Sequence, residues 1–171
     1  MVRTRSPVQV RLVALSARNV KRGDDIMLSV RRVNGENKDS VFQLWQRVFV
    51  DEQKICSVCI FNGQSELEVP YWDVILDIDG LEVGTGRLMQ VTKNVARILR
   101  ICVLEEYRNK KLGARIINEL EQIALENDFN ATLLLAQYEL KGYYLKYEYH
   151  DFSGIVADYG LPHVWMLKDL S

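Results

Sequence analysis

Two patterns of hydrophobic residues, one typical of a strand and one of a helix, follow each other in residues 97–126 of this chain. Residues 97–104 are mostly apolar and rich in branched side chains, which is typical of a strand buried on both faces. From residue 112 the apolar side chains recur about every 3.6 positions, which predicts an amphipathic helix to about residue 127. The strand and the helix form the centre of the predicted fold.

The N-terminal half carries weaker patterns of the same two kinds. Residues 26–33 alternate loosely between apolar and polar side chains and predict a first strand. An apolar stripe over residues 41–49 predicts a helix that Asp39 or Ser40 could cap. A second short helix is expected to run to about residue 60.

A strong hairpin signal follows. Residues 72–78 and 81–91 predict two strands, and the Asp79-Gly80 pair between them favours a tight turn. Gly84 and Gly86 lie inside the second strand, and no complete dinucleotide-binding glycine motif surrounds them. We therefore interpret them as sites of a bulge or of close packing.

The C-terminal part predicts another strand, a short helix and two more strands. Residues 131–137 form a near-continuous apolar run, which favours a buried strand parallel to residues 97–104 and joined to them through the helix by a right-handed crossover. A helix is expected over residues 138–147. Final strands are expected at 149–156 and 163–168, on either side of a turn at residues 160–162.

Composition fits one globular domain. The chain has 171 residues, of which 48% are hydrophobic and 26% charged. Its net charge of −1 gives no general electrostatic reason to bind nucleic acid. There is no apolar run near 18 residues, so we expect no membrane-spanning helix.

The charge is unevenly placed, because residues 1–23 hold six basic residues and no acidic one. We interpret residues 1–24 as a basic, flexible leader in which a short strand at 8–15 is conceivable, and residues 25–171 as the folded domain. The leader weakly resembles an organelle-targeting segment. The preferred expectation is a cytoplasmic protein.

Three cysteines, an odd number, argue against a disulfide framework. Cys56 and Cys59 form a C-x-x-C motif. A zinc site would need about four ligands at suitable spacing, and a thioredoxin-like motif would follow a strand. We therefore expect no metal and predict that the two thiols pack on an apolar face.

The turn between the central strand and helix is a candidate anion site. Arg108, Lys110 and Lys111 stand within four residues, directly before the helix. A helix N-terminus presents unpaired backbone N–H groups and the positive end of the helix dipole. A basic loop that is merely solvated is the alternative interpretation.

This stretch resembles the acetyl-CoA motif of the GNAT N-acetyltransferases, in which Arg or Gln is followed by x-x-Gly-x-Gly or Ala. Arg108, Gly113 and Ala114 fit that pattern, whereas Lys111 stands where the first glycine is expected. Further segments over residues 26–170 are similar to the ElaA/YjcF-like subgroup: residues 47–53, 66–68, 84–87, 100–103, 136–137, 143–144 and 160–163. Glu148 also replaces a family glycine, which suggests an altered turn.

The resemblance implies the GNAT fold: a mixed α/β architecture whose central sheet is mostly antiparallel, with splayed parallel central strands flanked by helices. It implies acetyl-CoA as co-substrate. The pantetheine arm would run along the backbone of Ile101, Cys102 and Val103. The other cofactor-binding residues implied are Arg108, Asn109, Lys110, Lys111, Leu112, Gly113, Ala114, Gln137 and Tyr144.

The family position of Tyr144 implies a general acid for the departing thiolate, since a phenol is protonated at neutral pH. Glu68 or His163 would be the base. Cys102 lies beside the expected thioester, but no partner for a cysteine nucleophile is apparent, which favours direct transfer. We expect Arg100, a cation in an apolar strand, to pair with Glu52 or Glu68.

The acceptor is expected to be a small-molecule amine, with Arg47, Gln53 and Arg100 as binding residues. An amino-sugar phosphate such as glucosamine 6-phosphate would use the cations Arg47, Arg87, Arg97 and Arg100. A polyamine would prefer the acids Asp51, Glu52, Glu66, Glu68 and Asp73, and a protein N-terminus would need an open groove. A non-catalytic acetyl-CoA sensor stays an alternative, and a homodimer is conceivable.

Overall fold

The computed structural model describes residues 26–33, 38–61 and 69–170. The predicted leader (residues 1–24), the strand considered at 8–15 and the candidate base Glu68 lie outside the described residues. No helix in the described ranges is both long and apolar enough to cross a membrane.

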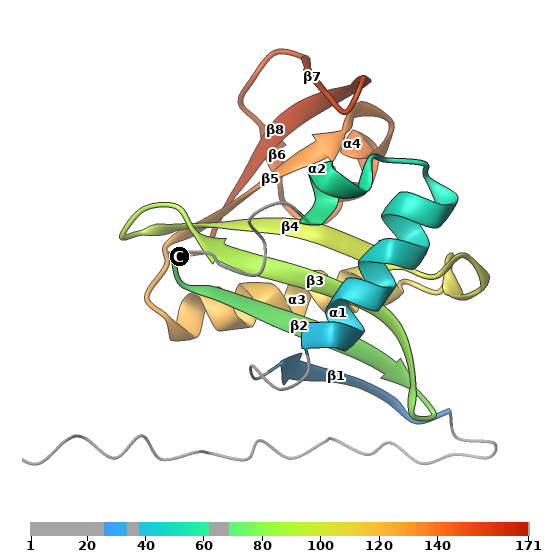
Figure 1. Ribbon diagram of the computed structural model, residues 1–171. Coiled ribbons are helices and arrows are strands. Elements are labelled where there is room, and N and C mark those ends of the chain that lie inside the picture. The colour runs from blue at the N-terminus through green and yellow to red at the C-terminus, as the bar shows by residue number, and fades with distance from the viewer. Residues whose placement is uncertain (1–25, 34–37, 62–68, 171) are drawn as a thin grey trace, which may run out of the picture.

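The described residues form eight strands and several helices, which Figure 1 labels. The strands are β1 (Leu28–Val33), β2 (Tyr71–Ile78), β3 (Leu81–Gln90), β4 (Val95–Val103), β5 (Ala131–Gln137), β6 (His150–Asp151), β7 (Val156–Asp158) and β8 (Leu161–Asp169). The α-helices are α1 (Lys38–Trp45), α2 (Ser57–Phe61), α3 (Leu112–Glu126) and α4 (Lys141–Leu145). A π-helix (Gln46–Glu52) continues α1, and 3₁₀ turns stand at Glu105–Tyr107 and Tyr138–Leu140.

Within the described residues, eight strands form one mixed sheet in the order β1-β2-β3-β4-β5-β8-β6, with β7 also paired to β8. Every pairing is antiparallel except that of β4 with β5. The chain passes from β4 to β5 through α3, as the sequence predicted for a parallel neighbour.

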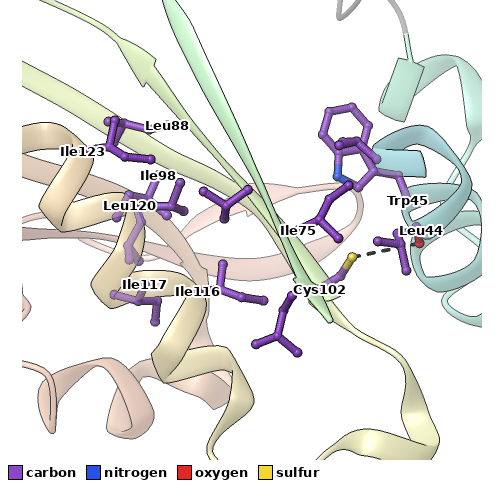
Figure 2. Close-up of a cluster of buried hydrophobic side chains, with 14 of the residues drawn as sticks. Leu44, Trp45, Ile75, Leu88, Ile98, Cys102, Ile116, Ile117, Leu120 and Ile123 are labelled. Atoms are coloured by element: carbon purple, nitrogen blue, oxygen red, sulfur yellow. Dashed lines mark hydrogen bonds between the residues drawn. The ribbon is translucent and has the colours of Figure 1, made fainter. Parts of the chain in front are cut away.

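Helices cover both faces of the β2–β4 region, α1 on one face and α3 on the other (Figures 1 and 2). Alternate residues of a strand point to opposite faces. Gly86 of β3 therefore faces Ile116 of α3, and Arg87 faces Trp45 of α1. The largest side chains with almost no exposed surface come from these layers and include Trp45, Ile75, Leu88, Ile98, Ile116, Ile117, Leu120 and Ile123.

The glycines of β3 serve close packing, which confirms the interpretation made from the sequence. A Cβ atom added to Gly86 would lie 2.6 Å from Cγ2 of Ile116. One added to Gly84 would lie 2.9 Å from the Cys102 carbonyl oxygen. Helix α3 thus approaches the sheet closely because β3 has no side chain at these points.

The β2–β3 hairpin closes on Asp79 and Gly80, as predicted. Ile78 pairs with Leu81, so the loop has two residues. Both have positive φ, 52° for Asp79 and 80° for Gly80. Two positive φ values are the signature of the type I′ turn, whose twist matches that of the flanking strands.

Three sequence predictions were wrong in detail. The strand expected at residues 149–156 is two short strands, β6 and β7, and the final turn is at Tyr159 and Gly160. Both turn residues have positive φ, so the chain reverses before Pro162. The first helix begins at Lys38, so Asp39 and Ser40 lie inside it and do not precede it.

Candidate active site

The opening between β4 and β5 is the feature around which the candidate site is built. The two strands pair only at Val95–Ala131, Ala96–Thr132 and Arg97–Leu133. Beyond these pairs they diverge, which Figure 1 shows between the lower and upper parts of the sheet. Backbone N–H and C=O groups on the facing edges are then free to bind an extended ligand.

A cavity of about 360 Å³ fills this opening. β4 contributes residues 97–101 to its wall, and β5 contributes residues 134–137. Its other lining residues are Phe49, Gln53, Ile55, Met89, Leu140, Tyr144, Asp158, Tyr159 and His163. Two of the predicted catalytic residues, Tyr144 and His163, are thus brought together with the predicted acceptor residues Gln53 and Arg100.

Tyr144 of α4 lines the cavity with a hydroxyl that makes no hydrogen bond to any described residue. Burial raises the pKa of Tyr144 to about 12, because removal from water disfavours the charged phenolate. By contrast, the hydroxyl of Tyr149 lies 2.9 Å both from the Thr132 hydroxyl and from a Glu121 carboxylate oxygen. Tyr149 is an ordinary core tyrosine, and Tyr144 is a protonated donor in a cavity.

His163 of β8 is held in one orientation at the other side of the cavity. Its Nδ1 lies 2.9 Å from the Leu161 carbonyl oxygen. A carbonyl oxygen can only accept, so Nδ1 carries the proton in this contact. In the neutral ring, Nε2 then holds the lone pair that a base requires.

Arg97 and Arg100 bring two positive charges to the same cavity wall. The Nε atom of each is buried and has no hydrogen-bond partner. Among the described residues, neither arginine forms an ion pair with a carboxylate. The guanidinium carbon of Arg97 lies 4.7 Å above the ring of Trp165. Burial, and then the charge of Arg100, lower the pKa of Arg97.

Arg100 owes its direction to a β-bulge in β4. Arg87 of β3 pairs with Leu99 and Thr85 pairs with Cys102, so Arg100 and Ile101 together oppose a single residue of β3. The φ of Arg100 is 56°, in the left-handed region. A bulge of this kind redirects a side chain and is frequent beside active sites.

The bulge turns Arg100 toward α2 and the β7–β8 turn. Its Nη2 atom donates to the Cys59 carbonyl oxygen at 3.0 Å, and its Nη1 atom lies 3.2 Å from the Tyr159 hydroxyl. The expected pair with Glu52 is wrong, because Glu52 binds Arg108 instead. The alternative partner, Glu68, lies outside the described residues.

The predicted phosphate turn has the backbone of an anion site. Asn109 and Lys111 have φ values of 63° and 58°, so both adopt the left-handed conformation that favours glycine. Lys111 keeps that conformation where the family pattern has glycine. No side chain caps α3 at Lys111, which leaves its first N–H groups available to a ligand.

Arg108 is not directed at that turn. Its Nη1 and Nη2 atoms bind both carboxylate oxygens of Glu52 at 2.7 and 2.6 Å, and its Nε donates to the Val103 carbonyl oxygen at 2.9 Å. The fork raises the pKa of Arg108. In this structure Arg108 ties the end of β4 to the π-helix.

Gly113, at the start of α3, lies directly below Tyr143. A Cβ atom added to Gly113 would be 3.0 Å from the Tyr143 hydroxyl oxygen. Burial and a hydrogen bond with Tyr147 raise the pKa of Tyr143. Any larger side chain at residue 113 would occupy the space between the turn and this hydroxyl.

Cys102 is directed away from the opening. The residue is 5% exposed, and its thiol lies 3.9 Å from the Leu44 carbonyl oxygen of α1 (Figure 2). Burial raises the pKa of Cys102 to about 12. A thiol of this kind is a poor nucleophile at neutral pH, in line with direct transfer.

Several predicted residues lie outside the cavity. Arg47 is exposed and faces Glu106, 3.5 Å away. Arg87 is buried in a pair with Asp73. Neither Arg87 nor Asp73 can therefore bind an acceptor in the way that the sequence had suggested. Lys110 is exposed above the Tyr107 ring.

The predicted packing of Cys56 and Cys59 is wrong, because both thiols are exposed. In the short helix α2 the buried residue is Ile60. Helical spacing places Cys59 next to Ile60 on the turn but on the outer side. A five-residue helix is too short for a reliable apolar stripe, which explains the error.

The expected altered turn at Glu148 has a definite form. The φ of Glu148 is 69°, so a non-glycine residue again adopts the left-handed conformation. Its carboxylate is 85% exposed and lies 3.7 Å from Lys168. The residue after it, Tyr149, returns to the core.

Sequence reasoning missed Asp158, Tyr159 and Phe49 as cavity residues. Asp158 and Tyr159 come from the last hairpin, for which the sequence placed the turn slightly too late. Phe49 comes from the π-helix, a feature that often occurs at functional sites and has no periodic signal in the sequence.

Comparisons with known proteins agree with this architecture. A family model described as an acetyltransferase (GNAT) domain matches residues 72–170, a range that includes Tyr144 and His163. YyaT of Bacillus subtilis is 28% identical over 145 residues, which span 84% of this chain and 97% of YyaT.

Two solved structures share the fold. Escherichia coli ElaA superposes with a TM-score of 0.74 at 19% identity, over 84% of this chain and all of that chain (100%). An acyl-CoA N-acyltransferase from Pseudomonas aeruginosa gives 0.72 at 21% identity, over 84% and 99%. The fold class predicted from the sequence is thereby confirmed.

Proposed function

The chain belongs to the GNAT acetyltransferases, and on that premise we propose that it moves the acetyl group of acetyl-CoA to a primary amine of a small molecule. Transfer is direct, within a ternary complex of both substrates. The observation that carries the proposal is the convergence of Tyr144 and His163 on the cavity between β4 and β5.

The donor is bound along the diverging edge of β4 and at the start of α3. The pantetheine arm follows the backbone of Ile101, Cys102 and Val103, where the parallel ladder has ended. The pyrophosphate lies on residues 108–114, with Gly113 leaving the space it needs. Gln137 contributes from the end of β5.

His163 takes the proton of the acceptor amine through Nε2, directly or through a water. The amine then attacks the thioester carbonyl, polarised by the N–H of Val103. Tyr144 gives its proton to the sulfur as the C–S bond breaks. The raised pKa of Tyr144 supports this role, since the phenol stays protonated through the neutral range.

The acceptor we propose carries an anionic group beside its amine, such as the phosphate of glucosamine 6-phosphate. Arg97 and Arg100 line the cavity, and each has a buried Nε without a partner. An anion would satisfy these donors and offset their mutual repulsion. Asp158, which also lines the cavity, suits the ammonium group of the incoming amine.

A polyamine is less well served, since three of the acids expected to attract it are engaged elsewhere. Asp73 is paired with Arg87, and Glu52 with Arg108. Asp51 accepts a hydrogen bond from Gln46.

An amine panel tests the reaction. The full-length chain is incubated with acetyl-CoA and an amino-sugar phosphate, its unphosphorylated sugar, a polyamine or a short peptide, and acetylated product is measured by chromatography. We expect the phosphorylated sugar to be the best acceptor. Acetyl-CoA binding with no product from any amine would mean that the chain is a sensor.

Isothermal titration with acetyl-CoA tests the donor site. Gly113→Glu should abolish measurable binding, because it fills the space below Tyr143 with a negative charge. Gly154→Glu is the matched control, since its added Cβ would meet nothing within 4 Å. Equal affinity in both variants would contradict the donor site.

The base is tested by pairing His163→Gln with Glu68→Gln. We expect the His163 variant to lose turnover and the Glu68 variant to keep it. The opposite result would assign the base to Glu68.

A further inference from the structure

Two exposed thiols stand beside the acceptor cavity and have no part in the proposed transfer. Cys56 directly precedes α2, and Cys59 lies within it. Ile55, the residue before the pair, lines the cavity, as does Arg100, which binds the Cys59 carbonyl oxygen. The C-x-x-C motif is therefore at the cavity rim.

The backbone brings the two thiols to one helical turn. The Ile60 N–H donates to the Cys56 carbonyl oxygen at 3.3 Å, which is the bond that opens the turn. Residues three apart on such a turn have neighbouring side chains, about 5–6 Å apart at Cβ. A disulfide needs about 3.5–4.5 Å between the Cβ atoms, so a modest tightening of the turn suffices.

The pair has one nucleophilic and one resolving thiol. Hydrogen bonds from the backbone N–H groups of Cys59 and Val58, and then from the Cys59 thiol, lower the pKa of Cys56. The same contact with Cys56 raises the pKa of Cys59. A thiol with a lowered pKa next to a second thiol is the arrangement that thiol–disulfide exchange uses.

A metal site is the other use of two such thiols. Among the described residues, no third His, Cys, Asp or Glu side chain joins them to form a metal-binding group. Two ligands alone do not make the closed four-ligand set of a structural zinc site. The geometry favours disulfide chemistry.

The backbone of Cys59 is joined to the acceptor wall. Its carbonyl oxygen accepts a hydrogen bond from Arg100 Nη2 at 3.0 Å and one from the Tyr159 hydroxyl at 3.4 Å. The Tyr159 hydroxyl in turn lies 3.2 Å from Arg100 Nη1. A movement of the Cys59 backbone therefore changes the support of both cavity residues.

We propose that Cys56 and Cys59 form a reversible disulfide, made by exchange with a small-molecule disulfide, which shifts Arg100 and weakens acceptor binding. This regulation rests on the proposed function, but the disulfide itself does not.

The exchange balances in two steps. The Cys56 thiolate attacks one sulfur of the small disulfide, forms a mixed disulfide and releases one small thiolate, which takes a proton from solvent. The Cys59 thiol then loses its proton to solvent and attacks the Cys56 sulfur, which expels the second small thiolate. The protein loses two electrons and the small disulfide gains them.

Mass spectrometry of the full-length chain tests the disulfide. After equilibration with oxidised glutathione and alkylation, we expect peptides 56–59 to be two hydrogen masses lighter and reducible, and Cys102 to stay a free, unalkylated thiol until the protein is denatured. Cys56→Ser should form no adduct, and Cys59→Ser should stop at a mixed disulfide with glutathione.

Two outcomes would overturn the proposal. One is that both thiols are alkylated at every ratio of oxidised to reduced glutathione. The other is stoichiometric zinc in the purified protein that is lost in Cys59→Ser, which would make the pair a metal site.

Coupling to the cavity is measured in two ways. The NMR signal of the Arg100 Nε–H should shift on oxidation of the wild type and stay in place in Cys56→Ser. The acceptor KM should rise about five- to tenfold on oxidation, the scale of a weakened hydrogen bond to a charged group, with kcat little changed. An unmoved signal and an unchanged KM would contradict the coupling.

The outcomes separate this inference from the proposed function. If the disulfide forms but no acetyl transfer occurs under any condition, the disulfide proposal stands and the proposed enzyme reaction is overturned. If turnover is full but no disulfide forms, the enzyme reaction stands and the disulfide proposal is overturned.

Discussion

Arg87 of β3 pairs with Leu99 of β4, so it lies close to Arg97 and Arg100 along the neighbouring strand. The surroundings of Arg87 are nevertheless the opposite of those of the two β4 arginines. Arg87 has no exposed side-chain surface, and two of its nitrogens bind Asp73 at 2.6 and 2.7 Å. Its guanidinium also lies over the rings of Trp45 and Tyr71. On the β1–β4 side of the sheet, the buried charge is fully compensated.

The β4–β5 opening lacks that compensation. Arg97 and Arg100 keep buried Nε atoms without partners, and the one carboxylate among the cavity residues, Asp158, attracts Arg97 only at a distance and forms no ion pair among the described residues. Uncompensated buried charge costs free energy unless a ligand supplies the partner. The difference distinguishes the arginine that stabilises the fold from those that await a substrate.

The largest effect should come from breaking the compensated pair. Asp73→Asn removes the carboxylate charge that binds two nitrogens of the buried Arg87 and should lower the free energy of unfolding by about 3–5 kcal/mol. Chemical denaturation measures the change. Asp151→Asn is the control, since Asp151 pairs with Lys141 on the surface and its loss should change the stability far less. Equal losses would remove the contrast between buried and exposed pairs.

The next effect concerns the two tyrosines. Tyr144→Phe should lower kcat about 100-fold with little loss of stability, because its hydroxyl is used only as the C–S bond breaks. Tyr149→Phe should lower the stability and leave kcat almost unchanged, since the Tyr149 hydroxyl bonds Thr132 and Glu121 in the core. Steady-state kinetics measure kcat, and thermal unfolding measures the stability, of both variants. A Tyr144→Phe enzyme with normal kcat would make Tyr144 a packing residue.

The uncompensated arginines should affect the acceptor alone. Arg97→Gln or Arg100→Gln should raise the KM for a phosphorylated amino sugar roughly 10- to 100-fold, the scale of a lost charge-assisted hydrogen bond. The KM for the unphosphorylated sugar and the affinity for acetyl-CoA should hardly change. Arg31→Gln provides a control outside the cavity. Equal losses for both sugars would show that these arginines do not bind the phosphate.

High pH should weaken the fold through the buried phenols. The pKa of Tyr144 is about 12 when folded, against an ordinary value of 10. Because the folded state holds the proton more tightly, this contribution is complete below pH 10 and is lost as pH rises from 10 to 12. Denaturation at pH 9 and pH 11 should show a smaller decrease in Tyr144→Phe than in the wild type. An identical decrease would mean that Tyr144 is solvated.

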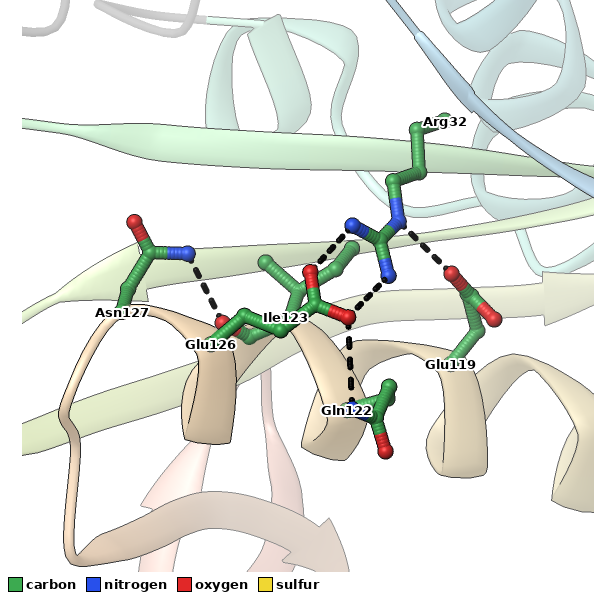
Figure 3. Close-up of polar contacts among 6 residues, drawn as sticks. All are labelled: Arg32, Glu119, Gln122, Ile123, Glu126 and Asn127. Carbon is green, nitrogen blue, oxygen red and sulfur yellow. Dashed lines mark hydrogen bonds and ion pairs between the residues drawn. The ribbon is translucent and has the colours of Figure 1, made fainter. Parts of the chain in front are cut away.

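The smallest effect should come from a pair network on the surface. Arg32 of β1 binds Glu119 at 2.7 Å and both carboxylate oxygens of Glu126 on α3 (Figure 3). Its side chain is 38% exposed, so water and salt screen the attraction. Arg32→Gln should cost under about 1 kcal/mol, and less still in 1 M salt. A loss comparable with that of Asp73→Asn would overturn this ranking.

The order of the elements could be predicted because its signals are local. The period-2 and 3.6-residue patterns, the Asp79-Gly80 turn and the basic stretch before α3 each lie within a few neighbouring residues. The same applies to the parallel pairing of β4 and β5, which follows from strand, helix and strand in succession.

The charge environments could not be predicted, because partners come from distant residues. In the sequence, Arg87, Arg97 and Arg100 are equivalent cations in apolar strands. Only the tertiary fold pairs Arg87 with Asp73 and places Arg100 in a β-bulge. Likewise, Glu52 could pair with Arg100 or Arg108 until the π-helix fixed its direction.

The divergence of β4 from β5 also bears on aggregation. An unpaired strand edge is a template on which a strand of another molecule can add. Here the exposed edge carries two devices that oppose such addition, a β-bulge at Arg100 and charged side chains pointing into the gap. The residues that prepare the cavity for an anion thus also keep neighbouring copies of the protein from joining their sheets.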